Sequence, residues 1–151
     1  MEMMAEKNID RRAESVQKLH TLLESRADTL VLYNQLASFR PFEAKLELRE
    51  LLEEFCESLV DYTASAHFQL YRFIAEGTER RKSVKDLADK VYPLISNMTQ
   101  KILDFNDKYE KATEQKDFAT LDGDLSVLGE VLADRISHED NIIGILTDER
   151  S

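Results

Sequence analysis

Apolar residues recur at steps of three and four along nearly the whole chain, in four stretches that short breaks separate. Because an α-helix turns once every ~3.6 residues, this spacing places the apolar side chains of each stretch on one side of a helix. Stripes of this kind are buried by packing helix against helix. The second stripe is the clearest, and it consists of Leu48, Leu51, Phe55, Leu59, Tyr62, Ala66, Leu70 and Phe73.

The stripes predict four long helices, at residues of about 8–39, 42–75, 83–116 and 120–146. Pro41 separates the first two, because the residue before a proline disfavours helix. Gly77 follows the second helix, at a place where a left-handed cap residue is expected. Pro93 lies inside the third helix and removes one backbone donor, so we expect a kink there rather than an end.

Turn-forming residues are few, since the 151 residues include four Gly and two Pro. A sheet of many strands needs more turns than this, so the composition also favours helices. No linker and no internal repeat indicates a second domain. The sequence therefore predicts one helical domain over residues 1–151, with an all-α fold. The short loops favour an antiparallel, up-and-down four-helix bundle with long helices.

The chain carries a formal net charge of −10 at pH 7. An acidic surface repels DNA phosphates and anionic lipids and attracts basic proteins, so neither nucleic acid nor membrane is expected as a direct ligand. The alternative is that the acidity only keeps the protein soluble. The single cysteine, Cys56, suits a reducing compartment, and residues 1–10 lack the apolar segment of a signal peptide, so we expect a cytoplasmic protein.

One aromatic residue interrupts the polar side of the second helix, opposite its apolar stripe. At about 100° per residue, Phe68 lies roughly 20° around the helix axis from Asp61. An exposed ring beside carboxylates resembles an interface anchor with a charged rim. The alternatives are a lone exposed apolar residue, or a ring that a terminal segment covers. The residues on this side are Glu54, Glu57, Asp61, Ser65, Phe68 and Arg72.

A carboxylate falls within the apolar stripe of the fourth helix, where Glu139 lies between Ile136 and Ile143. A buried carboxylate needs a partner or a shifted pKa. Arg135, one turn earlier, is placed to pair with it, and a basic or hydroxyl group from another helix is expected to add to the pair. We interpret Arg135 and Glu139 as a structural polar network rather than a functional centre.

The histidines do not follow the spacing of a metal site. His138 has neither Glu nor His three or four residues away, and His67 is followed at those positions by Leu70 and Tyr71. No phosphate-binding glycine loop, nucleophile elbow or paired-cysteine motif is present in the sequence. We therefore expect no metal, no cofactor and no enzyme activity. The alternative from this class is a metal-binding bundle of the di-iron or hemerythrin type.

Three segments of the chain resemble the Rsd/AlgQ family, the regulators of sigma D. The most specific segment runs from Phe55 to Tyr62, followed by Ala66-His67-Phe68 and Tyr71. The Tyr92-Pro93 pair is also similar to the family. The resemblance covers most of the chain, from the first helix to about Leu146. The remaining segment contains Leu128-Gly129-Glu130, Leu132, Arg135, Glu139-Asp140 and Ile142-Ile143.

The resemblance implies a cytoplasmic four-helix anti-sigma factor that binds region 4 of the principal sigma factor of RNA polymerase. Region 4 reads the −35 promoter element and docks on the core enzyme, so binding implies that both contacts are blocked and transcription is regulated. Asp61 and Phe68 match the family positions that contact the sigma factor. The other predicted contacts on the same face are Glu54, Glu57, Ser65 and Arg72.

The expected complex is one monomer bound to one sigma factor. A basic helix-turn-helix module meeting an acidic face indicates competition with DNA for one surface. Family members are also linked to the phosphocarrier HPr. A scaffold protein that binds HPr is therefore a further alternative.

Overall fold

A computed structural model of the chain describes residues 2–71 and 82–147. The described residues form helices and contain no strand, which confirms the predicted all-α class. No described helix combines the length and the apolar composition that a membrane-spanning segment needs. In chain order, the elements are α1 (Glu2–Ala37), α2 (Leu46–Ala66), the π-helix η1 (His67–Tyr71), α4 (Lys82–Tyr109), the 3-10 helix η2 (Gln115–Phe118) and α5 (Leu121–Thr147).

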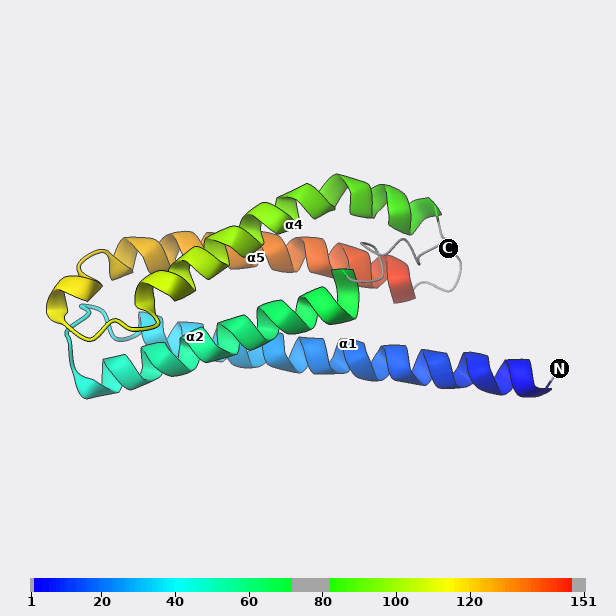
Figure 1. The fold of residues 1–151 in the computed structure, drawn as a ribbon, viewed down its shortest axis with the longest axis horizontal. Helices are drawn as coiled ribbons and strands as arrows, with labels where there is room; N and C mark the ends of the chain where they lie inside the picture. The colour runs from blue at the N-terminus through cyan, green and yellow to red at the C-terminus, as the bar shows by residue number, and fades with distance from the viewer. Residues whose placement is uncertain (1, 72–81, 148–151) are drawn as a thin grey trace.

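The long helices lie along one another in two pairs. α1 packs on α2 and α4 packs on α5, and these are the most extensive contacts between elements. Figure 1 shows α2 returning along α1 and α5 returning along α4. α2 also contacts α4, which joins the two pairs. α2 therefore has neighbours on two sides and leaves a third side to solvent.

The start of α2 is set by a contact with the distant 3-10 helix η2. α2 begins at Leu46, later than the predicted start at Phe42. The Gln115 side chain accepts a hydrogen bond from the Ala44 N–H (2.8 Å) and donates one to the Phe42 carbonyl (3.1 Å). Backbone groups that are paired in this way do not join the helical ladder. The first helix also differs from its prediction, since α1 begins at Glu2, whereas the bounds of α5 agree with the predicted range to within one residue.

The end of α4 at Tyr109 comes before the predicted end of the third helix. The Asp117 carboxylate accepts hydrogen bonds from the N–H groups of Glu114 (2.9 Å) and Thr113 (3.0 Å), so these groups are paired outside α4. The same two bonds favour the ionised carboxylate and hold the pKa of Asp117 below its usual range. As predicted, the helix continues through Pro93, and Figure 1 shows a bend in the N-terminal half of α4.

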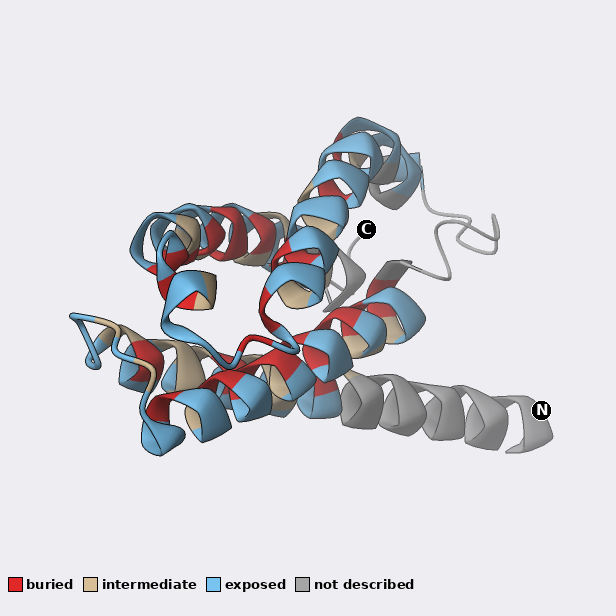
Figure 2. Ribbon diagram, turned by 60° about the vertical axis from the view of Figure 1, so that its left-hand side comes forward, coloured by how far each residue is buried: buried red, intermediate tan, exposed pale blue. Residues whose placement is uncertain are grey.

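The apolar stripes meet in one buried core, which Figure 2 shows as buried bands along the helices. Phe55 of α2 lies with its ring centroid 6.1 Å from that of Tyr33 and 6.0 Å from that of Phe105. Each large apolar side chain buried in this way contributes about 1.5–3 kcal/mol to folding. The apolar spacing of the third predicted helix includes Leu94 among its buried residues, but Leu94 is 45% exposed and Ile95 is buried instead.

Candidate protein-binding surface

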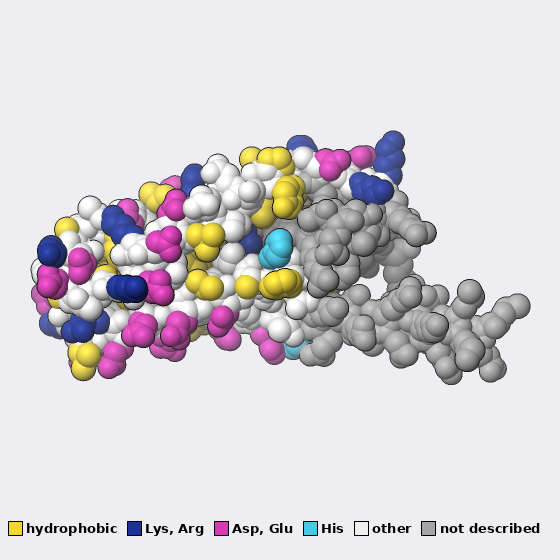
Figure 3. Space-filling view, in the orientation of Figure 1, with side chains coloured by type: hydrophobic (Ala, Val, Ile, Leu, Met, Phe, Trp, Pro, Cys, Tyr) yellow, Lys and Arg dark blue, Asp and Glu magenta, His cyan; other side chains and the backbone are white. Residues whose placement is uncertain are grey.

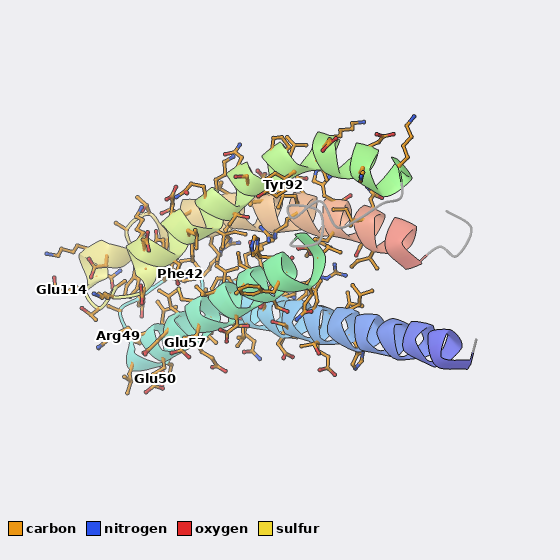
Figure 4. All side chains as sticks on the ribbon, turned by 45° about the vertical axis from the view of Figure 1, so that its right-hand side comes forward. Phe42, Arg49, Glu50, Glu57, Tyr92 and Glu114 are labelled. Atoms are coloured by element: carbon orange, nitrogen blue, oxygen red, sulfur yellow. The ribbon has the colours of Figure 1, made fainter. Side chains whose placement is uncertain are left out.

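The solvent side of α2 carries a row of acidic side chains. Glu50, Glu54, Glu57 and Asp61 are all exposed, and Figure 4 shows Glu50 and Glu57 on this helix. Phe68 follows the row and is 56% exposed. The ring and the carboxylate that the sequence places together therefore both face solvent. A large ring left in water beside several carboxylates is a feature of protein-binding surfaces.

Phe68 lies in the π-helix η1 and not in the regular helix before it. A π turn accommodates an extra residue and is frequent at functional sites. The ring of His67 packs edge-on against the ring of Phe68, with 5.5 Å between centroids. The sequence prediction used a regular α-helix, so it did not detect this change of helix type. Phe68 nevertheless faces solvent, as the sequence predicted.

Ser65 lies differently from the rest of the predicted face. It is half-buried, and its hydroxyl oxygen is buried with no hydrogen-bond partner among the described residues. Ser58, two turns earlier on the same side of α2, shares a hydroxyl–hydroxyl hydrogen bond of 2.8 Å with Thr29 of α1. This side of α2 therefore packs towards α1, which removes Ser65 from the exposed row. Arg72, also predicted for this face, lies outside the described residues.

A groove of about 400 Å³ lies between α2 and α4 beside Phe68. Figure 3 shows apolar side chains gathered over α2 and α4 on both sides of a histidine. The residues of α4 that line this groove were not predicted from the sequence. Tyr92 and Leu103 are large apolar residues that lie off the apolar stripe of their helix, and this position is the signal that could have identified them. We call this the apolar groove, lined by Val60, Thr63, Ala64, His67, Phe68, Tyr92, Ile95, Ser96, Thr99, Gln100, Leu103 and Arg135.

A second groove, of about 480 Å³, adjoins the first, since Val60 lines both. Its four carboxylates and one ammonium give it a negative potential, which attracts cations. Burial, aided by the charge of Glu110, raises the pKa of the Cys56 thiol to about 12, so the thiol stays neutral and is a poor nucleophile. We call this the acidic groove, lined by Glu53, Cys56, Glu57, Val60, Asp61, Asn106, Glu110 and Lys111.

A buried charge network lies beneath the apolar groove and connects α1, α2, α4 and α5. Its centre is Glu139, whose carboxylate accepts hydrogen bonds from the Tyr62 hydroxyl (2.5 Å) and from Arg135 Nε (3.2 Å). Arg26 Nη1 lies 3.5 Å from the same carboxylate. Arg135 also donates to the Thr99 hydroxyl (2.6 Å) and lines the groove. The sequence identified Arg135 and Glu139 but not the three partners on other helices, because helix-to-helix alignment is not a local property.

The three histidines, His20, His67 and His138, lie on three different elements. His67 packs on the ring of Phe68, and His138 is half-buried on α5. Among residues 2–71 and 82–147, no group of three or more His, Cys, Asp or Glu side chains is placed to hold a metal ion.

Comparison with known proteins matches residues 2–147 to the family described as regulator of RNA polymerase sigma(70) subunit, Rsd/AlgQ. A protein of Yersinia enterocolitica named Regulator of sigma D is 38% identical over 125 residues, covering 80% of this chain and 75% of that protein. Proteins of the same name from Enterobacter sp. and Salmonella newport are 36% and 34% identical, each covering 83% of this chain and 78% and 79% of their own lengths. No solved structure matches the chain. The chain therefore belongs to the Rsd/AlgQ family, the regulators of the sigma(70) subunit of RNA polymerase.

Proposed function

We propose that the chain is an anti-sigma factor that binds region 4 of the principal sigma factor and blocks its contacts with the −35 promoter element and the core enzyme. The observation that carries the proposal is the exposed pair of Asp61 and Phe68 on an acidic helix face, in a chain whose family regulates sigma(70). The protein acts in the cytoplasm as a regulator and not as an enzyme. One monomer binds one sigma factor, with Glu54 and Glu57 contributing to the contact.

Electrostatics supports a mechanism of occlusion. Region 4 is a helix-turn-helix module, whose basic residues meet DNA phosphates. The exposed row that contains Glu54, Glu57 and Asp61 presents negative charge to the same residues, which raises the association rate and sets the orientation of the partner. Phe68 then supplies apolar area that loses water on binding. Promoter DNA and the anti-sigma factor compete for one surface, so a bound sigma factor does not read a promoter.

The proposed scaffold for this face is a single domain folded as an antiparallel four-helix bundle. The pairing of α1 with α2 and of α4 with α5 supports this arrangement. The network around Glu139 supports it as well, since it connects all four long helices. A face held by packed helices loses little conformational freedom on binding, and this raises affinity.

Titration calorimetry with purified region 4 of the principal sigma factor tests the proposed function. Phe68→Ala is expected to weaken binding by about 2 kcal/mol or more, roughly thirty-fold, because the anchor is lost. Asp61→Ala is expected to weaken binding and to reduce its dependence on salt. Leu46→Ala is the matched control, because Leu46 is 62% exposed on the same helix but lies at its opposite end. Unchanged affinity of both the Asp61 and the Phe68 variants, with native melting temperatures, would contradict the proposal.

A further inference from the structure

The two walls of the apolar groove are stripes on two helices. Val60 and Ala64 of α2 and Phe68 of η1 follow one another at steps of four residues, and on α4 the wall extends from Tyr92 to Leu103. Residues spaced in this way lie on one side of a helix. At about 1.5 Å per residue, the α4 wall is about 17 Å long. The apolar groove is therefore an elongated seam between two helices rather than a round pocket, and we refer to it as the seam.

The seam has a buried floor and an exposed apolar rim. Ile95 and Arg135 in its floor are 3% and 1% exposed. On the rim, Phe68 is 56% exposed, Tyr92 41% and Leu103 38%. A single exposed apolar residue is ordinary, but apolar side chains on both sides of one groove form a patch that favours contact with a partner. The rim therefore has the character of an unfilled packing surface.

We propose that this seam takes one amphipathic α-helix of the sigma factor, laid lengthwise between α2 and α4. The inference rests on the proposed function and adds the form and orientation of the bound segment. Apolar side chains of that helix enter the apolar groove between Phe68 and Tyr92, and its basic side chains lie over the acidic groove beside Asp61. Tyr92, Ser96 and Leu103 of α4 then determine specificity together with the residues of α2.

The shape of the seam favours a helix over other occupants. A length of about 17 Å receives about three helical turns, enough for apolar anchors at positions i, i+3, i+4 and i+7. Addition of an extended strand needs the free backbone groups of a sheet edge, and the described residues contain no strand. A small molecule is held in a pocket that encloses most of its surface, whereas the aromatic rim of this seam lies open to solvent.

Charge favours a basic partner over a second copy of this chain. Glu53, Glu57, Asp61 and Glu110 line the acidic groove with Lys111 as its single cation. The whole chain carries a formal charge of −10. Two copies seated in each other's seams would bring like charges together, which is unfavourable. A helix with one apolar part and one basic part is complementary to both grooves at once.

Variants of the α4 wall test the inference by calorimetry with region 4. Tyr92→Ala and Leu103→Ala are each expected to weaken binding by about five- to ten-fold, because each removes apolar contact area. Ser96→Trp is expected to weaken binding by about thirty-fold or more, since Ser96 is exposed and the larger side chain fills the seam. Leu94→Ala is the matched control, because Leu94 is 45% exposed on the same helix and does not line the seam.

The salt dependence of binding tests the orientation of the bound helix. Glu57→Gln is expected to reduce the change of Kd with salt concentration, whereas Tyr92→Ala leaves that change as it is in the parent chain. An equal effect of these two variants on the salt dependence would overturn the assigned orientation.

The possible failures are distinguishable. If the parent chain does not bind region 4, the proposed function fails. If the parent chain binds and Phe68→Ala weakens binding, but Tyr92→Ala, Leu103→Ala and Ser96→Trp all bind as the parent does, the function stands and the inferred seam is overturned. Melting temperatures near that of the parent show that the variants are folded.

Discussion

Glu139 has no exposed surface, yet it lies among ionisable groups contributed by other helices. Removing an ion from water costs several kcal/mol, so it must be compensated by close partners. Arg26 lies near this carboxylate and also bonds Asp140 at 2.8 Å. Burial opposes the charge of Arg26, but the hydrogen bond and charge of Asp140, together with the charge of Glu139, raise its pKa overall. The Arg26 guanidinium is therefore held in its charged form beside the Glu139 carboxylate.

The Tyr62 hydroxyl is the neutral donor in that network. Tyr62→Phe is expected to lower the free energy of unfolding by about 1–3 kcal/mol, because Glu139 loses this donor inside the protein. Urea denaturation followed by circular dichroism measures the change. Tyr92→Phe is the control, since Tyr92 is 41% exposed; its effect is expected to be below about 0.5 kcal/mol. Equal losses of unfolding free energy in the two variants would show that the buried hydroxyl contributes no more to stability than an exposed one.

Cys56 is expected to be unreactive in the folded protein. With a pKa of about 12, its thiolate fraction at pH 8 is about a thousandfold below that of an ordinary cysteine. Reaction with a chromogenic disulfide reagent should therefore be slow in the native state and fast in urea. Native protein that reacts as fast as unfolded protein would contradict the burial of this side chain.

At the scale of the helix, Gly129 makes room on α5 for the Tyr33 side chain of α1. A Cβ atom added at this position would meet the hydroxyl and ring of Tyr33. That hydroxyl donates a hydrogen bond of 2.8 Å to the Leu125 carbonyl, which holds the ring in place. The position of the Tyr33 ring against α5 therefore favours a residue without a side chain at 129.

Two glycines of α5 offer a matched comparison. Gly129→Ala is expected to lower stability by about 1–3 kcal/mol, because overpacking against Tyr33 outweighs the better helix propensity of alanine. Gly123→Ala is expected to raise stability by up to about 1 kcal/mol, because nothing lies within 4 Å of the added Cβ. Chemical denaturation of both variants checks the opposite signs. Stabilisation by Gly129→Ala would show that the Tyr33 ring does not lie against this position.

The paired helices also decide which side of each helix is available. Ser65 was predicted for the exposed face of α2, but the contact between Ser58 and Thr29 turns that side towards α1. Ile95, rather than Leu94, is buried on α4. Both differences are local, and each depends on the neighbouring helix whose side chains interlock with that position.

At the scale of the molecule, the net charge of −10 has opposite effects on folding and on binding. Like charges on one surface repel each other, so the compact state is expected to gain stability as salt screens them. Attraction to a basic partner is screened by the same ions, so the complex weakens. Between about 50 and about 500 mM NaCl, the melting temperature should rise while the Kd for region 4 increases.

Thermal melts and titrations at matched salt concentrations check this prediction together. A melting temperature that falls with salt would show that attractive ion pairs, such as Arg40 with Asp122 at 2.7 Å, dominate the surface electrostatics. A Kd that does not change with salt would show that the acidic row takes no part in binding.

Local periodicity predicted the helical class of the described residues and the exposure of Asp61 and Phe68. The spacing of apolar residues indicates which side of a helix is buried and therefore which side faces solvent. It also predicted that α4 continues through Pro93, since a helix tolerates the loss of one backbone donor at a bend.

Only the tertiary structure decided what lies beside Phe68. Tyr92 and Leu103 line a groove with it because α2 and α4 are aligned in one particular register, and Tyr62 reaches Glu139 for the same reason. The first turn predicted for the second helix is replaced by a non-helical segment that Gln115 of η2 holds by two hydrogen bonds. An apolar stripe on one helix predicts which of its side chains are buried. Which side chains of another helix they contact depends on how the two helices pack together, and one stripe does not contain that information.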